Sequence, residues 1–260
     1  MRTSDAGPGR HDTLTVVSMA VIASALATLL HEGVGHGLVA LARGDVPTEL
    51  TSNHLSSLRA DRVVAAAGTI VNLIAGSAAL LASSRQGPRA NARYFLWLLA
   101  ALNLLPGAGY FMFSGTFGFG DWNAVIQGLP HQPALRVCMT AGGAALYVIV
   151  VWLLAVAVRP FVPVRSMYNT VGRVPYYAAG VFSCAAGLLD PLGIRLLIVS
   201  TMPAAFGGSS GLLWADSLLP RTPATHAQLV VSRSVAWWIA ALIGGAAYIA
   251  VLGPGIRLMS

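Results

Sequence analysis

Lysine is absent from this sequence of 260 residues, and only 10% of the residues carry a charge. Soluble domains carry about a quarter charged residues, so the composition excludes an ordinary soluble globular protein. All 16 positive charges are arginines, and nearly all of them lie at or near the ends of apolar runs. This placement is typical of membrane topology signals rather than of a nucleic-acid-binding patch, and we expect no nucleic-acid partner.

Cysteine is scarce as well. The two cysteines, Cys138 and Cys184, each lie inside an apolar run. Thiols in such positions are usually small packing residues, so the sequence does not indicate a disulfide framework.

Long apolar runs are what the sequence has instead. Hydrophobic residues make up 56% of it, and the mean hydropathy is +0.70. These runs predict an all-α, multi-pass protein of the cell membrane, with about six transmembrane helices in contact with the lipid bilayer. The expected spans are residues 13–42, 63–84, 94–106, 137–158, 176–206 and 234–256.

The chain divides into three parts. Residues 1–12 are polar and are expected to form a disordered N-terminal tail. Residues 13–125 form a membrane-embedded core that holds the motifs described below, and residues 126–260 supply additional transmembrane helices.

The fifth apolar run is interrupted by Asp190-Pro191 and then by Arg195. It is either one kinked helix or two half-helices, since proline removes a backbone donor. Asp190 and Arg195 could neutralise each other in a polar cavity, or Asp-Pro could simply end a helix near a surface. Residues 207–233 contain glycine, serine and proline and are predicted to form a loop.

The hexapeptide His31-Glu32-Gly33-Val34-Gly35-His36 lies inside the first apolar run. An ionisable cluster within a membrane segment is unfavourable, which makes it a functional-site candidate. Two imidazoles and a nearby carboxylate are the groups that zinc catalysis uses, with a third ligand supplied from elsewhere in the fold. The alternative is two buried histidines that pack against other helices, with Glu32 as a chance neighbour.

The spacing of the two histidines is unusual. In the common H-E-x-x-H motif the histidines are four residues apart and share one face of an α-helix. His31 and His36 are five apart, which separates them by about 140° on a regular helix. A π-helical distortion accommodates one inserted residue, and Gly33 and Gly35 make such a distortion easier.

A glycine-rich stretch follows the third run. It extends from Gly107 to Gly120, contains aromatic residues, and ends at Asp121. Because unwound backbone at membrane depth is tolerated only inside protein or beside a wet cavity, we expect a re-entrant or loosely helical wall that leads to this acid. An interfacial loop with Asp121 in water is the alternative.

Three motifs occur in order on the first three apolar runs. The first is the histidine hexapeptide, the second is Gly-x-x-x-Asn, and the third is Asn-x-x-Pro followed later by an Asp. The residues that carry them are His31, Glu32, Gly35, His36, Ala40 and Gly44, then Gly68 and Asn72, then Asn103, Pro106 and Asp121. With these motifs the chain resembles the site-2 protease family of intramembrane zinc metalloproteases over about residues 14–125.

The resemblance implies a zinc site held by His31, His36 and Asp121, with Glu32 as the catalytic general base. It also implies that Asn72 or Asn103 contacts the substrate, and that the substrate is a membrane-anchored polypeptide. Two features depart from the family pattern: the inserted residue in the first motif and the long separation between Pro106 and Asp121.

Because Asp121 departs most from the family pattern, His54 and His131 are the alternative candidates for a third ligand. A second interpretation is a zinc-binding but non-proteolytic membrane protein, such as a regulatory or chaperone-like relative. A third is a transporter that uses Asp190 and Arg195 and binds no zinc.

Two indications of the orientation in the membrane disagree with each other. Six spans would place both ends of the chain on one side, and the distribution of arginines favours that side as cytoplasmic. The family resemblance favours the reverse orientation.

Overall fold

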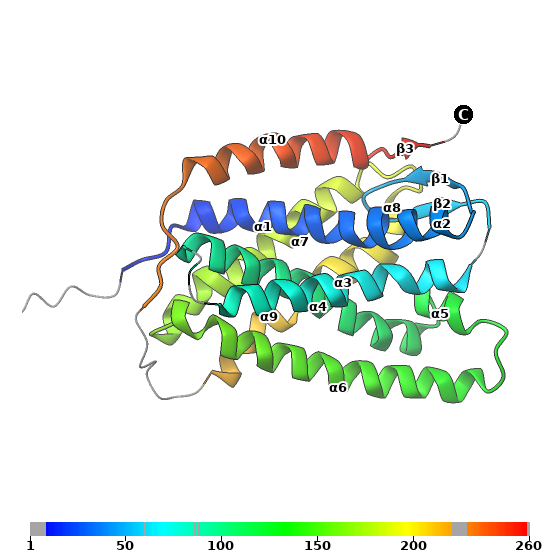
Figure 1. The fold of residues 1–260 in the computed structure, drawn as a ribbon, viewed down its shortest axis with the longest axis horizontal. Helices are drawn as coiled ribbons and strands as arrows, with labels where there is room; N and C mark the ends of the chain where they lie inside the picture. Colours follow the sequence, from blue (N-terminus) through cyan, green and yellow to red (C-terminus); the bar gives the residue numbers. More distant parts are fainter. Residues whose placement is uncertain (1–8, 60, 86, 88, 220–227, 259–260) are drawn as a thin grey trace, which may run out of the picture.

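The computed structural model describes residues 9–59, 61–85, 87, 89–219 and 228–258. Most of them belong to helices that lie side by side in one elongated bundle (Figure 1). In chain order the helical elements are α1 (Thr13–Thr28), η1 (Leu29–Leu38), α2 (Val39–Ala42), α3 (Arg62–Ser84), α4 (Ala90–Phe117), α5 (Asp121–Ile126), α6 (Gln132–Val158), η2 (Arg159–Phe161), η3 (Arg165–Met167), η4 (Asn169–Arg173), α7 (Val174–Gly187), α8 (Ile194–Leu196), η5 (Leu197–Thr201), η6 (Pro203–Gly208), α9 (Gly211–Trp214), η7 (Ala215–Leu218) and α10 (Val235–Leu252).

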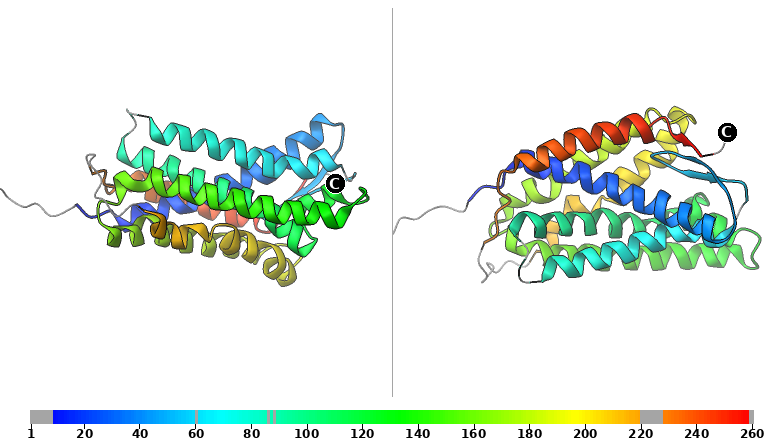
Figure 2. Two further views of the ribbon diagram at one scale, coloured as in Figure 1. Left: turned by 90° about the horizontal axis from the view of Figure 1, so that it is seen from below. Right: turned by 45° about the horizontal axis from the view of Figure 1, so that its top comes forward.

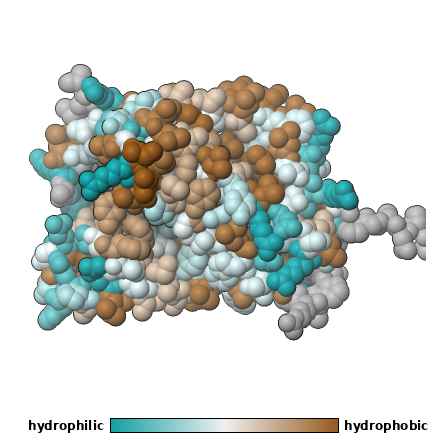
Figure 3. All heavy atoms as spheres, turned by 180° about the vertical axis from the view of Figure 1, so that it is seen from behind, coloured by the Kyte–Doolittle hydropathy of each residue, from teal (hydrophilic) through white to brown (hydrophobic). Residues whose placement is uncertain are grey.

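Six helical segments of the described chain are long and apolar enough to cross a membrane. Seen from behind, apolar side chains cover much of the middle of the bundle, and most hydrophilic ones lie toward its two ends (Figure 3). The expected all-α, multi-pass architecture is therefore confirmed. The six segments are Thr13–Ala42, Arg62–Ser84, Ala90–Phe117, Gln132–Phe161, Ile194–Leu218 and Val235–Leu252.

Helix α7 is shorter than these segments but also runs along the bundle (Figures 1 and 2). It connects the end of the bundle where His11 bonds the Phe161 carbonyl to the end where Asn53 bonds Asp190. With this additional passage, the first and last described residues lie at opposite ends of the bundle (Figure 1). Six passages alone would place both ends of the chain on one side, so α7 accounts for this difference.

A small antiparallel sheet lies at the end of the bundle opposite the N-terminus (Figure 1). Strands β1 (Pro47–Leu50) and β2 (Leu55–Ser57) form a hairpin, and β3 (Ile256–Arg257) pairs with β1. The all-α prediction did not include these strands. The pairing with β3 joins the end of the chain to this hairpin.

The large aromatic core lies toward the other end of the bundle. Trp97 and Tyr94 of α4 are almost fully buried, and their polar atoms donate to the carbonyls of Leu154 and Val171. Buried indole and phenol groups need such partners. The cavity described below lies in the other half of the bundle, near the hairpin.

Helix α4 continues through Pro106 to Phe117, so the predicted unwinding is confined to residues 118–120. The glycines at positions 107 and 115, which lie within α4, allow helix packing instead of unwinding. A Cβ at Gly115 would lie 2.5 Å from the Thr140 hydroxyl of α6, and one at Gly107 would lie 3.1 Å from Leu73 of α3. Glycine at these positions allows α4 to approach α3 and α6 closely. The periodicity of the sequence does not show which helices will be neighbours, so this role was not predicted.

The interrupted fifth region consists of two helical segments that are separated at Asp190-Pro191. Asp190 bonds Asn53 and the Leu192 backbone N–H, and it forms no ion pair with Arg195 among the described residues. The helical path then continues to Leu218, so the prediction of a loop from residue 207 is wrong. Residues 220–227 of that predicted loop lie outside the described residues.

The second helical segment is fixed at its end by ion pairs. Oδ2 of Asp216 lies 3.2 Å from Nε of Arg165 and 3.0 Å from Nη2 of Arg173. At the start of the chain, residues 1–8 of the predicted tail lie outside the described residues. His11, however, is buried and bonded to Phe161 and Val231, so the tail does not extend as far as residue 12.

Candidate metal centre

The π-helix η1 brings the two histidines of the hexapeptide together. A π-helix closes its hydrogen bonds over five residues, so His31 and His36 lie about one turn apart. Their ring centroids are 4.8 Å apart and the rings are nearly perpendicular. The predicted π-helical distortion is confirmed.

Two glycines allow η1 and α3 to cross closely at this point. A Cβ on Gly35 would lie 2.5 Å from the Cα of Gly68. A Cβ on Gly68 would in turn lie 2.5 Å from Nε2 of His36 and 2.7 Å from Nε2 of His31. Glycine at position 68 therefore leaves the space that both imidazole Nε2 atoms face.

A hydrogen bond from α3 orients the second histidine. Nδ1 of His36 lies 2.7 Å from the carbonyl of Val64, and both groups are buried. A carbonyl can only accept, so Nδ1 carries a proton, and Nε2 is the ring nitrogen that is left to bind a metal. Metal-binding histidines are typically held in this way by their second nitrogen.

Asp121 reaches the two histidines through a tight return of the chain. Gly118 and Gly120 have φ values of 63° and 83°, which glycine adopts without strain. They reverse the chain after α4 and place Asp121 at the first position of α5. Its Oδ2 atom lies 3.2 Å from Nε2 of His31 and 3.2 Å from Nε2 of His36.

Glu32 is buried beside the histidines. Ligand atoms of His31, Glu32 and His36 all lie within 4.8 Å of one another. Glu32 and His31 also line a cavity of about 1230 Å³ between η1, α4, α7 and the segment Ile194–Leu218. The segment Ile194–Leu218 contributes both small or hydroxyl-bearing residues and larger side chains to the lining, namely Arg195, Leu196, Val199, Ser200, Thr201, Pro203, Ala204, Ala205, Gly207, Gly208, Ser209 and Ser210.

The two asparagines of the sequence motifs have different surroundings. Asn72 lines the cavity, and its side-chain oxygen is buried without a hydrogen-bond partner among the described residues. Asn103 donates to the carbonyl of Leu99 within α4 and does not line the cavity. Of the two, only Asn72 is placed where it could meet a molecule in the cavity.

The alternative third ligands lie elsewhere. His54 bonds the Thr51 hydroxyl and faces the carboxylates of Glu49 and Asp190. His131 is exposed at the start of α6. Neither belongs to the cluster around His31.

Sequence analysis missed Tyr110. Its hydroxyl accepts a hydrogen bond from the Asp121 backbone N–H at 3.2 Å, and its ring centroid is 5.9 Å from that of His31. No spacing or motif marks this residue, because its role depends on the return of the chain after α4.

The donor atoms suit a divalent metal ion. Two imidazole nitrogens and one carboxylate oxygen face one another, and the glycine at position 68 adds no side chain to the space beside both imidazoles. Nitrogen ligands with a carboxylate are typical of zinc and related transition metals. These residues could therefore hold such an ion.

No protein-family model, curated protein sequence or solved structure matches this chain.

Proposed function

We propose that this protein is an intramembrane zinc metalloprotease similar to site-2 proteases, which hydrolyses a peptide bond of a membrane-anchored polypeptide. One observation carries the proposal. Nε2 of His31 and of His36 each lie 3.2 Å from the same Asp121 oxygen, inside a bundle of membrane-spanning length. Such a cluster in lipid is unfavourable without a function.

His31, His36 and Asp121 would hold the zinc ion. Bound there, zinc would acidify a water molecule and polarise the carbonyl of the scissile bond. Glu32 is the remaining buried acid of the cluster and lines the same cavity. It accepts the proton of the attacking water and passes it to the leaving amine, while the carbonyl carbon gains a C–O bond and loses its C–N bond.

The cavity supports a polypeptide as the substrate. The part of its lining that comes from the segment Ile194–Leu218 includes small and hydroxyl-bearing residues, which leave room for a locally unwound polypeptide and can bond its backbone. Asn72 lines the same cavity, and its side-chain amide would be the donor to the substrate carbonyl.

Metal removal tests this proposal. The purified protein is reconstituted in vesicles with a panel of epitope-tagged single-span membrane proteins. We expect cleavage of at least one panel member, its loss after treatment with a zinc chelator, and its recovery when zinc is returned. Protein that contains zinc but leaves every panel member intact would contradict the protease and favour the non-proteolytic zinc-binding protein.

A further inference from the structure

The backbone around Asp121 has little secondary structure of its own to hold it. A glycine turn precedes it, and the helix that it begins has only six residues. A metal ligand in such a segment needs support from a longer element. Helix α4 provides that support at two neighbouring residues.

The first contact fixes the backbone of Asp121. Its N–H donates to the Tyr110 hydroxyl at 3.2 Å. A Cβ on Gly120 would lie 2.7 Å from this hydroxyl, so any side chain at position 120 would push the two groups apart. The hydrogen bond thus depends on glycine immediately before Asp121.

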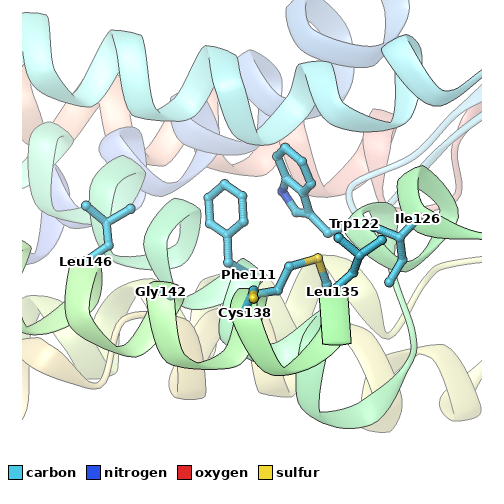
Figure 4. A pocket seen from close by; sticks show the side chains of 9 residues that line it. Phe111, Trp122, Ile126, Leu135, Cys138, Gly142 and Leu146 are labelled. Atoms are coloured by element: carbon cyan, nitrogen blue, oxygen red, sulfur yellow. The ribbon is translucent and has the colours of Figure 1, made fainter. Parts of the chain in front are cut away.

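The second contact fixes the residue that follows. The indole of Trp122 stacks on the ring of Phe111, with centroids 4.4 Å apart and planes at 32° (Figure 4). Both side chains line an apolar groove of about 420 Å³ between α4, α5 and α6. Nε1 of Trp122 is buried without a hydrogen-bond partner among the described residues, so apolar packing is what holds the indole.

We propose that Tyr110 is a positioning residue for the metal centre, acting together with the Phe111–Trp122 stack. Two consecutive residues of α4 hold two consecutive residues of α5, an arrangement that we name the α4–α5 clasp (Tyr110, Phe111, Asp121 and Trp122). The clasp fixes the Asp121 carboxylate opposite both imidazoles. The identity of the metal as zinc rests on the proposed function.

The clasp also accounts for the long separation between Pro106 and Asp121. Helix α4 runs on for about 10 Å after Tyr110 before it ends at Phe117. The glycine turn then reverses the chain and returns Asp121 to the level of Tyr110. The residues between Tyr110 and Asp121 therefore carry the chain past Tyr110 to the end of α4 and then back beside Tyr110, which explains the long separation.

The test compares Tyr110→Phe with Tyr147→Phe in the full-length purified protein. Tyr147 is a suitable control because its hydroxyl also makes backbone hydrogen bonds, to Gly208 and Gly211, but does not contact Asp121. Zinc affinity is measured by competition with a chelator, and ligand geometry by the visible absorption of the cobalt-substituted protein. We expect Tyr110→Phe to lower zinc affinity about 10- to 100-fold and to alter the cobalt spectrum, with no change in Tyr147→Phe.

A second pair of variants tests the stacking contact. Trp122→Ala should lower zinc affinity as Tyr110→Phe does, whereas Trp122→Phe retains a ring against Phe111 and should bind zinc nearly as wild type does. Wild-type affinity in both Tyr110→Phe and Trp122→Ala would overturn the clasp, as would an equal loss in Tyr147→Phe. None of these measurements uses a substrate, so the clasp can fail while the wild type still cleaves. A wild type that binds zinc but cleaves nothing would instead contradict only the protease.

Discussion

Glu32→Gln is expected to keep its zinc and to lose cleavage of the test substrates by about 10²- to 10⁴-fold, the range for removal of a general base. Glutamine has nearly the shape of glutamate but cannot accept the proton of the attacking water. The proposed function assigns the zinc ion to His31, His36 and Asp121 and not to Glu32, so zinc content should not change. Cleavage is followed by appearance of the tagged fragment, and zinc by elemental analysis.

The chain offers a matched control for this variant. Glu49 is the other glutamate of the sequence, and it lies in β1 beside His54 and does not belong to the group formed by His31, Glu32 and His36. Glu49→Gln should cleave as wild type does. If Glu32→Gln cleaved at the wild-type rate with zinc bound, Glu32 would have no role in proton transfer.

The second large effect is expected at Gly68. An added Cβ would lie within 2.7 Å of Nε2 of both histidines, in the space where a metal ion would lie. Gly68→Ala should therefore lose most of its zinc, and its cleavage activity with it. Overpacking of this kind also costs about 1–3 kcal/mol of stability, so zinc loss must be separated from general loosening of the fold.

Gly76→Ala separates these two effects. Gly76 lies on the same helix, and a Cβ there would lie 2.6 Å from the side chain of Leu104, away from the histidines. Both variants should therefore lower the thermal unfolding temperature, and only Gly68→Ala should lose zinc. Equal zinc content in the two variants would contradict the placement of the metal beside Gly68.

The sequence predicts the first span well because its ends are marked locally. Asp12 precedes it and accepts from the Thr15 backbone N–H, and Arg43-Gly44 follows it, so the predicted and observed span both cover residues 13–42. The π-helix was also predictable, because only a distorted helix brings His31 and His36 to one face.

Other features depend on partners that the local sequence does not identify. Glycine at positions 107 and 115 suggested unwinding, but these residues pack a continuous α4 against α3 and α6. Strand β3 pairs with a hairpin some two hundred residues earlier in the chain. Tyr110 becomes part of the site only because Gly118 and Gly120 reverse the chain and return Asp121 beside it.

The most direct measurement is the zinc content of the purified wild type beside His31→Ala, His36→Ala and Asp121→Ala, with His54→Ala as the control. His54 is a histidine of the same half of the bundle that does not belong to the cluster. The account predicts about one zinc per chain in the wild type and in His54→Ala, and almost none in the other three variants. A wild type without bound zinc, or an Asp121→Ala variant that keeps it in full, would contradict a metal centre shared by the first helix and α5.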